Sequence, residues 1–278
     1  MSWISGRRVL ITGPTSGIGK QIALELGAQG AELVLACRDT TKGVAVAQEI
    51  AALTGAIGTP VVMHVDASSQ RSLRAFSRSV HERYPRLDVL VNNAGTVQRE
   101  RLESEDGIEL TFATNVLGYH LLTTDLLGLL TGGAPARVVV VASTFASDLD
   151  LGDPQFTRRP FDGLQAYAQS KACNRLFTWA LARRLAGTGV TANAMAPGFV
   201  PGTELSRNLA PETRRAYKER SGRTMAQGSD TAVWLASSPD VAGTSGGFFF
   251  DRKALTCQFR GTAAEERLWD ICEGLITA

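Results

Sequence analysis

Near its start the chain runs Val9-Leu10-Ile11-Thr12-Gly13-Pro14-Thr15-Ser16-Gly17-Ile18-Gly19, and no other stretch says as much about the architecture to expect. An aliphatic run typical of a buried strand leads into glycines spaced G-x-x-x-G-x-G, and a helical pattern follows from Lys20. Glycine permits positive φ angles and close approach of backbone to phosphate, and a helix start offers free N–H groups to an anion. The predicted pyrophosphate contacts are Gly13, Ser16, Gly17, Ile18 and Gly19. Taken alone, these glycines fit a plain tight turn equally well.

Six more apolar runs of strand length follow, at residues 32–37, 61–65, 89–91, 138–141, 191–195 and 247–250. Between them apolar residues recur every three or four positions, as at Ile18, Ile22 and Leu26, which is typical of amphipathic helices. This alternation predicts an α/β fold: a doubly wound, Rossmann-type parallel sheet of about seven strands with helices on both faces. Ligands bind such sheets beyond the carboxyl ends of the strands.

The composition predicts a single folded domain over residues 1–278. Of the 278 residues 44% are hydrophobic, the net charge is +2, and no linker-like or repeated segment interrupts the chain. Two irregular stretches, 145–165 and 199–223, are expected at the mouth of the site as substrate loops. The second is rich in arginine and lysine, which favours a solvated helix face over a pocket for an acidic substrate.

The charge and the spacing of special residues exclude several function classes. A net charge of +2 indicates neither a nucleic-acid partner nor a cationic membrane-binding face, and no apolar run reaches the about 18 residues of a membrane helix. The four cysteines show no paired spacing, so a reducing cytoplasm is expected. His64, His81 and His120 show no metal-like spacing, and we expect no metal; His64 and His120 are expected to be packing residues and His81 a surface one.

Three further motifs follow the glycine loop in order: Asn92-Asn93-Ala94-Gly95, Tyr167-Ala168-Gln169-Ser170-Lys171 and Pro197-Gly198. With them, residues 5–250 resemble the short-chain dehydrogenase/reductase superfamily. The region 36–39, the interval from Ser143 to Tyr167 and the tail 246–253 look more like its retinol-dehydrogenase and WW-domain-oxidoreductase branch.

The spacing of Tyr167 and Lys171 places both side chains on one face of a helix. A neighbouring ammonium favours phenolate, so Lys171 is expected to lower the pKa of Tyr167 and allow it to exchange a proton with a carbonyl or alcohol. The resemblance adds Ser143, at the end of a strand, to orient the substrate oxygen, and Asn115 to hold a water that connects the lysine to solvent. Ser143 precedes Tyr167 by 24 positions, where many relatives have about a dozen. Asn115, a poor helix former, is also expected to sit at a local distortion.

The resemblance also implies a set of cofactor contacts. Asp66 would contact the adenine amide, and Asn93 with the Ala94-Gly95 backbone would contact the adenosine ribose region. At the other end, the nicotinamide side would be met by Pro197 and Gly198, and its ribose by Tyr167 and Lys171. Thr203 would contact either the pyrophosphate or the nicotinamide carboxamide.

The end of the second predicted strand, Cys37-Arg38-Asp39, bears on the choice of cofactor. NAD-binding folds place an acid here, which would repel the 2′-phosphate of NADP, whereas a guanidinium binds phosphate through two parallel bonds. Cys37 stands where the acid is expected, and Arg38 follows it. Asp39 either pairs with Arg38 or caps the next helix. We therefore predict that NADP is preferred, with NAD possible.

The resemblance therefore implies an NADPH-dependent oxidoreductase that transfers hydride between nicotinamide and a ketone or aldehyde and its alcohol. The alternative is a non-catalytic NADP(H)-binding sensor or interaction protein on the same fold. Aromatic and aliphatic residues of the two loops either line an apolar pocket or anchor the loops: Phe145, Phe156, Phe161, Phe199 and Leu205. The resemblance implies a homodimer or homotetramer, which the apolar stretch 117–130 permits.

Overall fold

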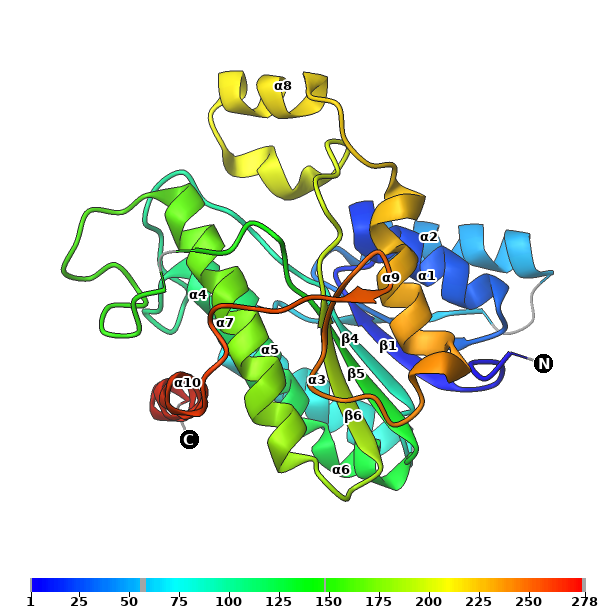
Figure 1. Cartoon of the computed structure of the whole chain (residues 1–278). Coiled ribbons are helices and arrows are strands. Elements are labelled where there is room, and N and C mark those ends of the chain that lie inside the picture. Colours follow the sequence, from blue (N-terminus) through cyan, green and yellow to red (C-terminus); the bar gives the residue numbers. More distant parts are fainter. Residues whose placement is uncertain (1, 56–58, 148, 277–278) are drawn as a thin grey trace.

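The computed structural model describes residues 2–55, 59–147 and 149–276. Within these residues eight strands form one sheet in the order β3-β2-β1-β4-β5-β6-β7-β8 (Figure 1). The strands are β1 (Arg8–Thr12), β2 (Glu32–Cys37), β3 (Val61–His64), β4 (Val89–Asn92), β5 (Ala136–Val141), β6 (Val190–Met195), β7 (Phe248–Phe250) and β8 (Lys253–Ala254).

The predicted doubly wound parallel sheet is confirmed, with one strand more than expected. β1 to β7 are parallel, and each overlaps one of the seven predicted runs. The additional strand β8 pairs antiparallel with β7. It has two residues, so it carries no alternating pattern that could have predicted it.

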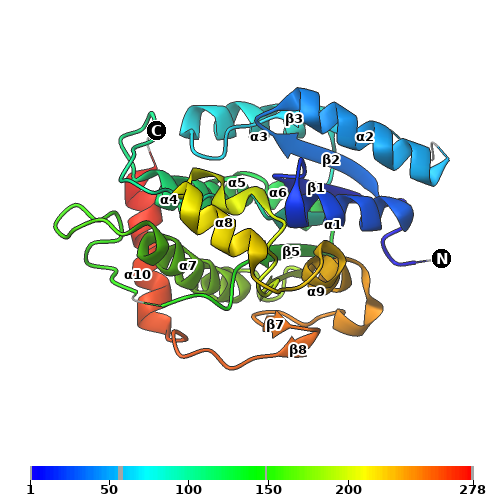
Figure 2. The same ribbon diagram turned by 90° about the horizontal axis from the view of Figure 1, so that it is seen from above.

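Helices cover both faces of the sheet (Figures 1 and 2). On one face α1 packs against α2 and α9; on the other lie α3, α5 and α7, and α10 packs outside α7. The helices are α1 (Gly17–Ala28), α2 (Thr40–Thr54), α3 (Gln70–Arg83), α4 (Leu110–Phe112), α5 (Gly118–Asp125), α6 (Leu127–Gly132), α7 (Gly163–Arg184), α8 (Pro211–Glu219), α9 (Met225–Ser237) and α10 (Thr262–Leu275). Shorter turns are the π-helical η1 (Ala113–Leu117) and the 3-10 turns η2 (Glu204–Asn208) and η3 (Pro239–Val241).

Alternate residues of each central strand enter two separate cores. In β1, Leu10 belongs to the core that contains Leu73 and Leu121, whereas Val9 and Ile11 belong to the core that contains Ile22. The side chains of Val9, Leu10 and Ile11 are all fully buried. Burying one such side chain stabilises the fold by about 1.5–3 kcal/mol. This two-sided burial holds the sheet rigid beneath the loops at its carboxyl edge.

The described residues of both irregular segments lie at that carboxyl edge, and their use as substrate loops stays a prediction. Figure 1 shows η2 and α8 standing above the ends of the strands, and residues 149–162 looping out before α7 begins. α8 has no buried residue. The position and shape of the lid formed by η2 and α8 therefore depend little on the cores below.

Candidate active site

The glycine loop forms a narrow cradle between β1 and α1. Gly13 and Gly17 have positive φ angles of 65° and 57°. A Cβ atom at Gly19 would lie 2.2 Å from Asn93 Nδ2 and 2.3 Å from the Gly13 carbonyl oxygen, so only glycine fits there. Ser16, the N-cap of α1, makes no capping hydrogen bond with its side chain. Unpaired backbone N–H groups at a helix start can bind a pyrophosphate, and this contact stays a prediction for the glycine loop.

Asn93 braces this loop through its side chain. Its amide Nδ2 donates to the carbonyls of Thr12 (2.9 Å) and Gly13 (3.1 Å). Thr12 Oγ1 in turn accepts from the backbone N–H groups of Asn93 (2.9 Å) and Ala94 (3.1 Å). The Asn93 amide is thus engaged with protein, and contact with the adenosine ribose stays a prediction for the Ala94-Gly95 backbone. Sequence analysis did not predict that Thr12 helps to hold this loop, because a threonine at the end of a strand is common and indicates no special role.

Asp39 resolves as a helix cap at the end of β2. Its carboxylate accepts from Lys42 N at 3.0 Å and caps α2, and its ion pair is with Lys42, whereas Arg38 pairs with Asp66. Arg38 is 69% exposed, with Nη1 3.7 Å from Asp66 Oδ2. Burial and the charge of Asp39 raise the pKa of the Cys37 thiol to about 11, which keeps it neutral. This corner therefore presents an exposed guanidinium and a neutral side chain where NAD-binding folds carry an acid.

The carboxylate of Asp66 lies next to Arg38 and can accept hydrogen bonds. Its Oδ1 accepts from the backbone N–H (2.9 Å) and hydroxyl (2.7 Å) of Ser68. Burial raises its pKa, but the hydrogen bonds from Ser68 and the charges of Arg38 and His64 outweigh it, so the net pKa lies below its ordinary value. His64 is exposed beside this carboxylate, so the expectation that it is a packing residue was wrong. It ends β3, whose side chains are only partly covered.

At the nicotinamide end, Pro197 and Gly198 follow β6, and Gly198 has a positive φ of 74°. Thr203 lies beside the glycine loop, because a Cβ atom at Gly17 would be 3.4 Å from Thr203 Cγ2. Of the two contacts considered for Thr203, this position favours the pyrophosphate.

Tyr167, Lys171 and Ser143 meet where α7 crosses the end of β5. Lys171 Nζ donates to the Val141 carbonyl at 2.9 Å and lies 5.7 Å from the centroid of the Tyr167 ring. The Tyr167 hydroxyl is hydrogen-bonded to the Ser143 side chain. Ser143 Oγ also accepts from Phe145 N at 3.0 Å. The three predicted side chains thus share one site.

The acid–base properties of this pair differ from the expectation. Burial raises the pKa of Tyr167 to about 12, although the hydrogen bond with Ser143 opposes this. Burial also lowers the pKa of Lys171 to about 7. The predicted lowering of the tyrosine pKa by Lys171 is absent, because burial is the largest influence on the pKa of Tyr167 and also disfavours the charged form of Lys171.

Asn115 is fully buried in the π-helical turn η1, so the expected local distortion is present. Its side chain accepts from Thr96 N at 2.8 Å and donates to Thr96 O (2.9 Å) and Ser170 Oγ (3.0 Å). Its main-chain carbonyl accepts from Asn174 Nδ2 at 2.6 Å. Asn174 Oδ1 is buried without a hydrogen-bond partner. Sequence analysis missed Asn174, whose place one turn beyond Lys171 on the same helix was the available signal.

Comparison with known proteins identifies the family of this site. The sequence model of the short chain dehydrogenase family matches residues 7–214. The chain belongs to the short-chain dehydrogenase/reductase superfamily. It is an oxidoreductase of the retinol-dehydrogenase branch, since human retinol dehydrogenase 14 is 38% identical over 98% of this chain and 86% of that protein.

Solved structures agree with this assignment to the short-chain dehydrogenases. An uncharacterized protein from Mycobacterium paratuberculosis has a TM-score of 0.80 and 30% identity, covering 99% of this chain and 95% of the other. A complex of Pseudomonas aeruginosa RhlG with NADP in its active site has a TM-score of 0.71 and 28% identity, covering 90% of this chain and 97% of the other.

The aromatic residues of this short-chain dehydrogenase divide between pocket and anchor. Phe145 is 52% exposed, and its ring stacks on Tyr167 with 6.4 Å between centroids. Phe156 is buried and packs edge-on against Phe161 at 5.4 Å, so this pair anchors its own loop. Phe199 packs against Tyr217 of α8 at 5.8 Å, while Leu205 is only partly buried within η2. Of these five residues, Phe145 is the one whose ring lies directly against Tyr167.

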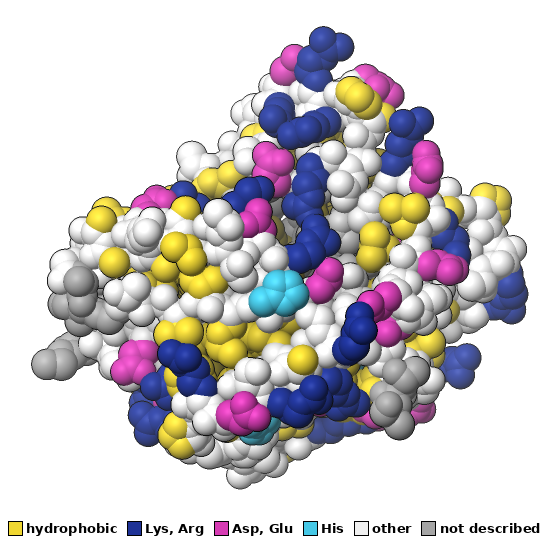
Figure 3. Space-filling model, turned by 180° about the vertical axis from the view of Figure 1, so that it is seen from behind, with side chains coloured by type: hydrophobic (Ala, Val, Ile, Leu, Met, Phe, Trp, Pro, Cys, Tyr) yellow, Lys and Arg dark blue, Asp and Glu magenta, His cyan; other side chains and the backbone are white. Residues whose placement is uncertain are grey.

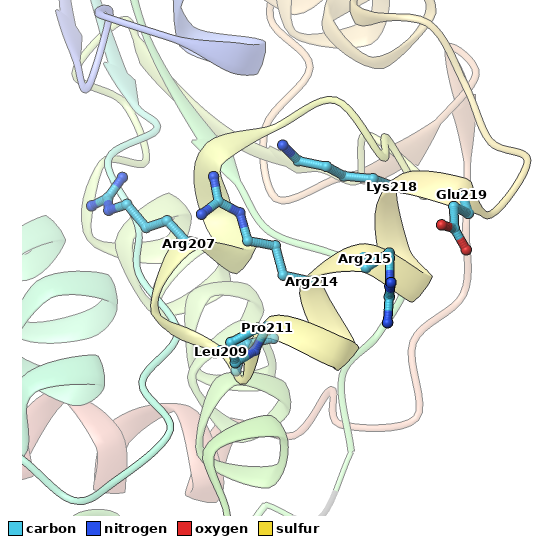
Figure 4. Close-up of a pocket in the computed structure, with 7 residues that line it drawn as sticks. All are labelled: Arg207, Leu209, Pro211, Arg214, Arg215, Lys218 and Glu219. Carbon is cyan, nitrogen blue, oxygen red and sulfur yellow. The ribbon is translucent and has the colours of Figure 1, made fainter.

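The lid of this dehydrogenase is strongly basic. Figure 3 shows Lys and Arg side chains gathered over the top of the molecule, where α8 lies. A cavity of about 430 Å³ opens there, and in Figure 4 Arg207, Arg214 and Lys218 extend toward one side while Arg215 points away. Its lining is Arg207, Leu209, Pro211, Arg214, Arg215, Lys218 and Glu219. Because α8 buries no side chain, the solvated-face interpretation accounts for these charges.

The remaining histidines lie as expected: His81 is exposed and His120 is buried, with Nε2 2.8 Å from Glu273 Oε1. Within the described residues, no helix has the length and apolar character needed to cross a membrane.

Proposed function

We propose that this chain is an NADPH-dependent carbonyl reductase or alcohol dehydrogenase acting on a ketone or aldehyde and the corresponding alcohol. The observation that carries the proposal is the meeting of Tyr167, Ser143 and Lys171 beside the glycine cradle, with the Tyr167 hydroxyl bonded to Ser143. A proton donor and an orienting hydroxyl at one point suit the reduction of a carbonyl oxygen.

The residues divide the work between binding and proton transfer. The loop from Gly13 to Gly19 with Thr203 would hold the pyrophosphate of NADPH, which supplies the hydride when bound. The Ser143 hydroxyl orients the substrate oxygen. Tyr167 is protonated at neutral pH, because its pKa is raised to about 12 by burial, and so serves as general acid in the reductive direction.

Lys171 has a second use in this proposal. Its pKa of about 7, lowered by burial, lets the amine take up or release a proton near neutral pH. It therefore can pass a proton toward Tyr167 after turnover, with Asn115 and the water predicted at η1 continuing the relay toward solvent.

The preference for NADPH rests on Arg38. Its guanidinium is exposed, Asp39 is occupied in capping α2, and Cys37 adds no charge to repel a 2′-phosphate. A charge-assisted bond worth about 1.5–3 kcal/mol corresponds to a preference of roughly ten- to a hundredfold for NADPH over NADH.

Titration of both cofactors tests this preference. In Arg38→Ala the affinity for NADPH should fall by roughly ten- to a hundredfold and that for NADH should change little. Lys42→Ala is the matched control, because Lys42 is a similarly exposed cation one turn away that pairs with Asp39. Equal affinities of the wild type for both cofactors would show that Arg38 does not recognise the phosphate.

Turnover itself is tested by screening carbonyl compounds while following the absorbance of NADPH. Phe145 beside Tyr167, and the retinol named in the relatives, support a bulky apolar or aromatic aldehyde or ketone as substrate. Tight NADPH binding with no oxidation by any carbonyl compound would favour the sensor alternative.

The cytoplasmic location and the homodimer or homotetramer stay predictions. The four cysteines are free, which supports a reducing compartment. The leucines of the stretch 117–130 offer less support for an interface than expected, because nearly all of them are buried within the chain: Leu117, Leu121, Leu122, Leu126, Leu129 and Leu130.

A further inference from the structure

Arg175 is an unusually buried cation one turn beyond Lys171 on α7, with 7% of its surface exposed. One guanidinium nitrogen, Nη2, donates to the main-chain carbonyl of Ser143. Nη1 donates to Cys257 Sγ at 3.1 Å, and Cζ lies 4.0 Å from the centroid of the Phe248 ring. Arg175 thus joins the proposed active site to the C-terminal part of the chain.

No carboxylate neutralises this guanidinium within the part of the chain that the structure describes. The charge meets a carbonyl, a thiol and two aromatic rings, the second being Phe259 at 5.7 Å, and Nε has no hydrogen-bond partner. A well-packed apolar side chain commonly serves stability as well as a buried charge does. What this guanidinium adds is a directed hydrogen bond to the backbone at Ser143.

That hydrogen bond holds the backbone of Ser143 itself, and the backbone sets the direction of the Ser143 side chain. The strand end is held at two points by α7, since Lys171 bonds the Val141 carbonyl at 2.9 Å and Arg175 bonds the Ser143 carbonyl. Tyr167, Lys171 and Arg175 are spaced by four residues, so one face of α7 carries all three. Fixing the Ser143 peptide also fixes the direction in which its Cβ and hydroxyl leave the backbone.

Two of the residues that contact Arg175, Cys257 and Phe259, come from the segment between β8 and α10. Figure 1 shows this segment crossing α7 on its way to α10. Cys257 and Phe259 from this segment, with Phe248 of β7, enclose the guanidinium. The C-terminal segment therefore holds Arg175 against Ser143.

We propose that Arg175 is a positioning residue that aims the Ser143 hydroxyl at the substrate oxygen, held in place by the C-terminal segment around Cys257. This inference rests on the proposed function, in which Ser143 orients the substrate. Arg175 touches neither substrate nor cofactor in this scheme, so its removal acts on turnover through Ser143 alone.

A double-mutant cycle with Ser143→Ala tests the proposal. Arg175→Met should lower kcat about tenfold in the wild-type background, because a misplaced group slows the reaction, and leave the Kd for NADPH unchanged. In the Ser143→Ala background the same substitution should lower kcat no further. Arg184→Met is the matched control: Arg184 also lies on α7 and over an aromatic ring, Trp269, but contacts no active-site residue and should leave kcat unchanged.

Each outcome decides one question. Equal losses of kcat from Arg175→Met in both backgrounds would overturn the positioning role. Wild-type activity in Ser143→Ala would instead refute the proposed function, whatever Arg175 does. If Arg175→Met does not fold, Arg175→Lys keeps the charge but not the forked geometry; it should lose kcat about threefold only when Ser143 is present, and full activity would contradict the proposal.

Discussion

At the scale of single residues, burial governs the chemistry of this site more than neighbouring charge does. Lys171 and Tyr167 are both shifted toward their neutral forms, and the pKa of Lys171 falls to about 7. Desolvation disfavours the charged form of either group, and among the described residues no carboxylate pairs with Lys171 to offset it. Keeping the Lys171 amine buried therefore costs stability wherever the unfolded chain would carry it charged.

This expense predicts a pH-dependent effect of Lys171→Met. The pKa of Lys171 is 10.5 when unfolded and about 7 when folded, so the unfolded chain binds more protons between these values and wild-type stability rises with pH across that window. The variant lacks this rise. Its free energy of unfolding relative to the wild type should be higher at pH 6.5 than at pH 10, by at least about 1.4 kcal/mol, the equivalent of one pKa unit.

Urea unfolding of the cofactor-free proteins at both pH values measures this difference, and parallel pH profiles of wild type and variant would contradict it. At the same time Lys171→Met should lose both turnover and cofactor affinity, since it removes the proposed proton relay and a ribose contact.

Sequence patterns pointed to Tyr167, Lys171 and Ser143 as candidate site residues, but they did not predict the direction in which the pKa of Tyr167 shifts. Tyr167, Lys171 and Ser143 could be found because their order and spacing are local and resemble a known family. The pKa of Tyr167 could not, because it depends on how deeply α7 is covered. Arg175 was missed because its partners Ser143 and Cys257 are 32 and 82 positions away, and no local pattern links them.

At the scale of elements, the glycine loop is the part most tightly specified by its own sequence. Its backbone, Asn93 and the start of α1 approach so closely that position 19 has no room for a side chain. The predicted start of the helix at Lys20 was late, since α1 begins already at Gly17. The reason is that glycines, which rarely signal a helix, form its first turn.

Gly19→Ala should therefore break the cradle. A Cβ atom 2.2 Å from Asn93 Nδ2 must displace the amide that braces the loop, which lowers NADPH affinity more than tenfold and stability by about 1–3 kcal/mol. Gly128→Ala in α6 is the control, because the nearest atom to its Cβ would be 3.9 Å away. Calorimetric NADPH titrations and thermal unfolding of both variants check this; unchanged affinity in Gly19→Ala would be inconsistent with a phosphate site at the loop.

At the scale of the whole molecule, the C-terminal helix α10 is fastened to the fold through His120. This buried side chain lies 2.8 Å from Glu273, and its ring packs edge-on against Trp269 at 4.4 Å.

The apolar pattern predicted the sheet and its two layers, since both depend on short-range periodicity. The docking of α10 on α7 could not be predicted, because it depends on contacts between distant parts of the chain.

His120 makes this attachment sensitive to acid. Burial lowers its pKa below the ordinary 6.5, although Glu273 opposes this, so the unfolded chain binds the extra proton first and stability falls as the pH drops below 6.5. His120→Gln cannot titrate and should lose less stability between pH 7.5 and pH 5, by about 1.4 kcal/mol for each unit of pKa lowering. Thermal unfolding at the two pH values measures this, and an equal acid loss in both proteins would show that His120 is not responsible.

In the proposed mechanism Tyr167 delivers a proton to the substrate oxygen, and removing the Tyr167 hydroxyl is the most direct test of that mechanism. Tyr167→Phe keeps the ring but loses the hydroxyl, so turnover of a substrate found with the wild type should fall at least about 100-fold while the Kd for NADPH stays nearly unchanged. Tyr84→Phe is the control. Tyr84 lies outside the site and its hydroxyl has no hydrogen-bond partner, so this substitution should leave turnover and the Kd for NADPH unchanged. Wild-type turnover in Tyr167→Phe would contradict the account of this active site.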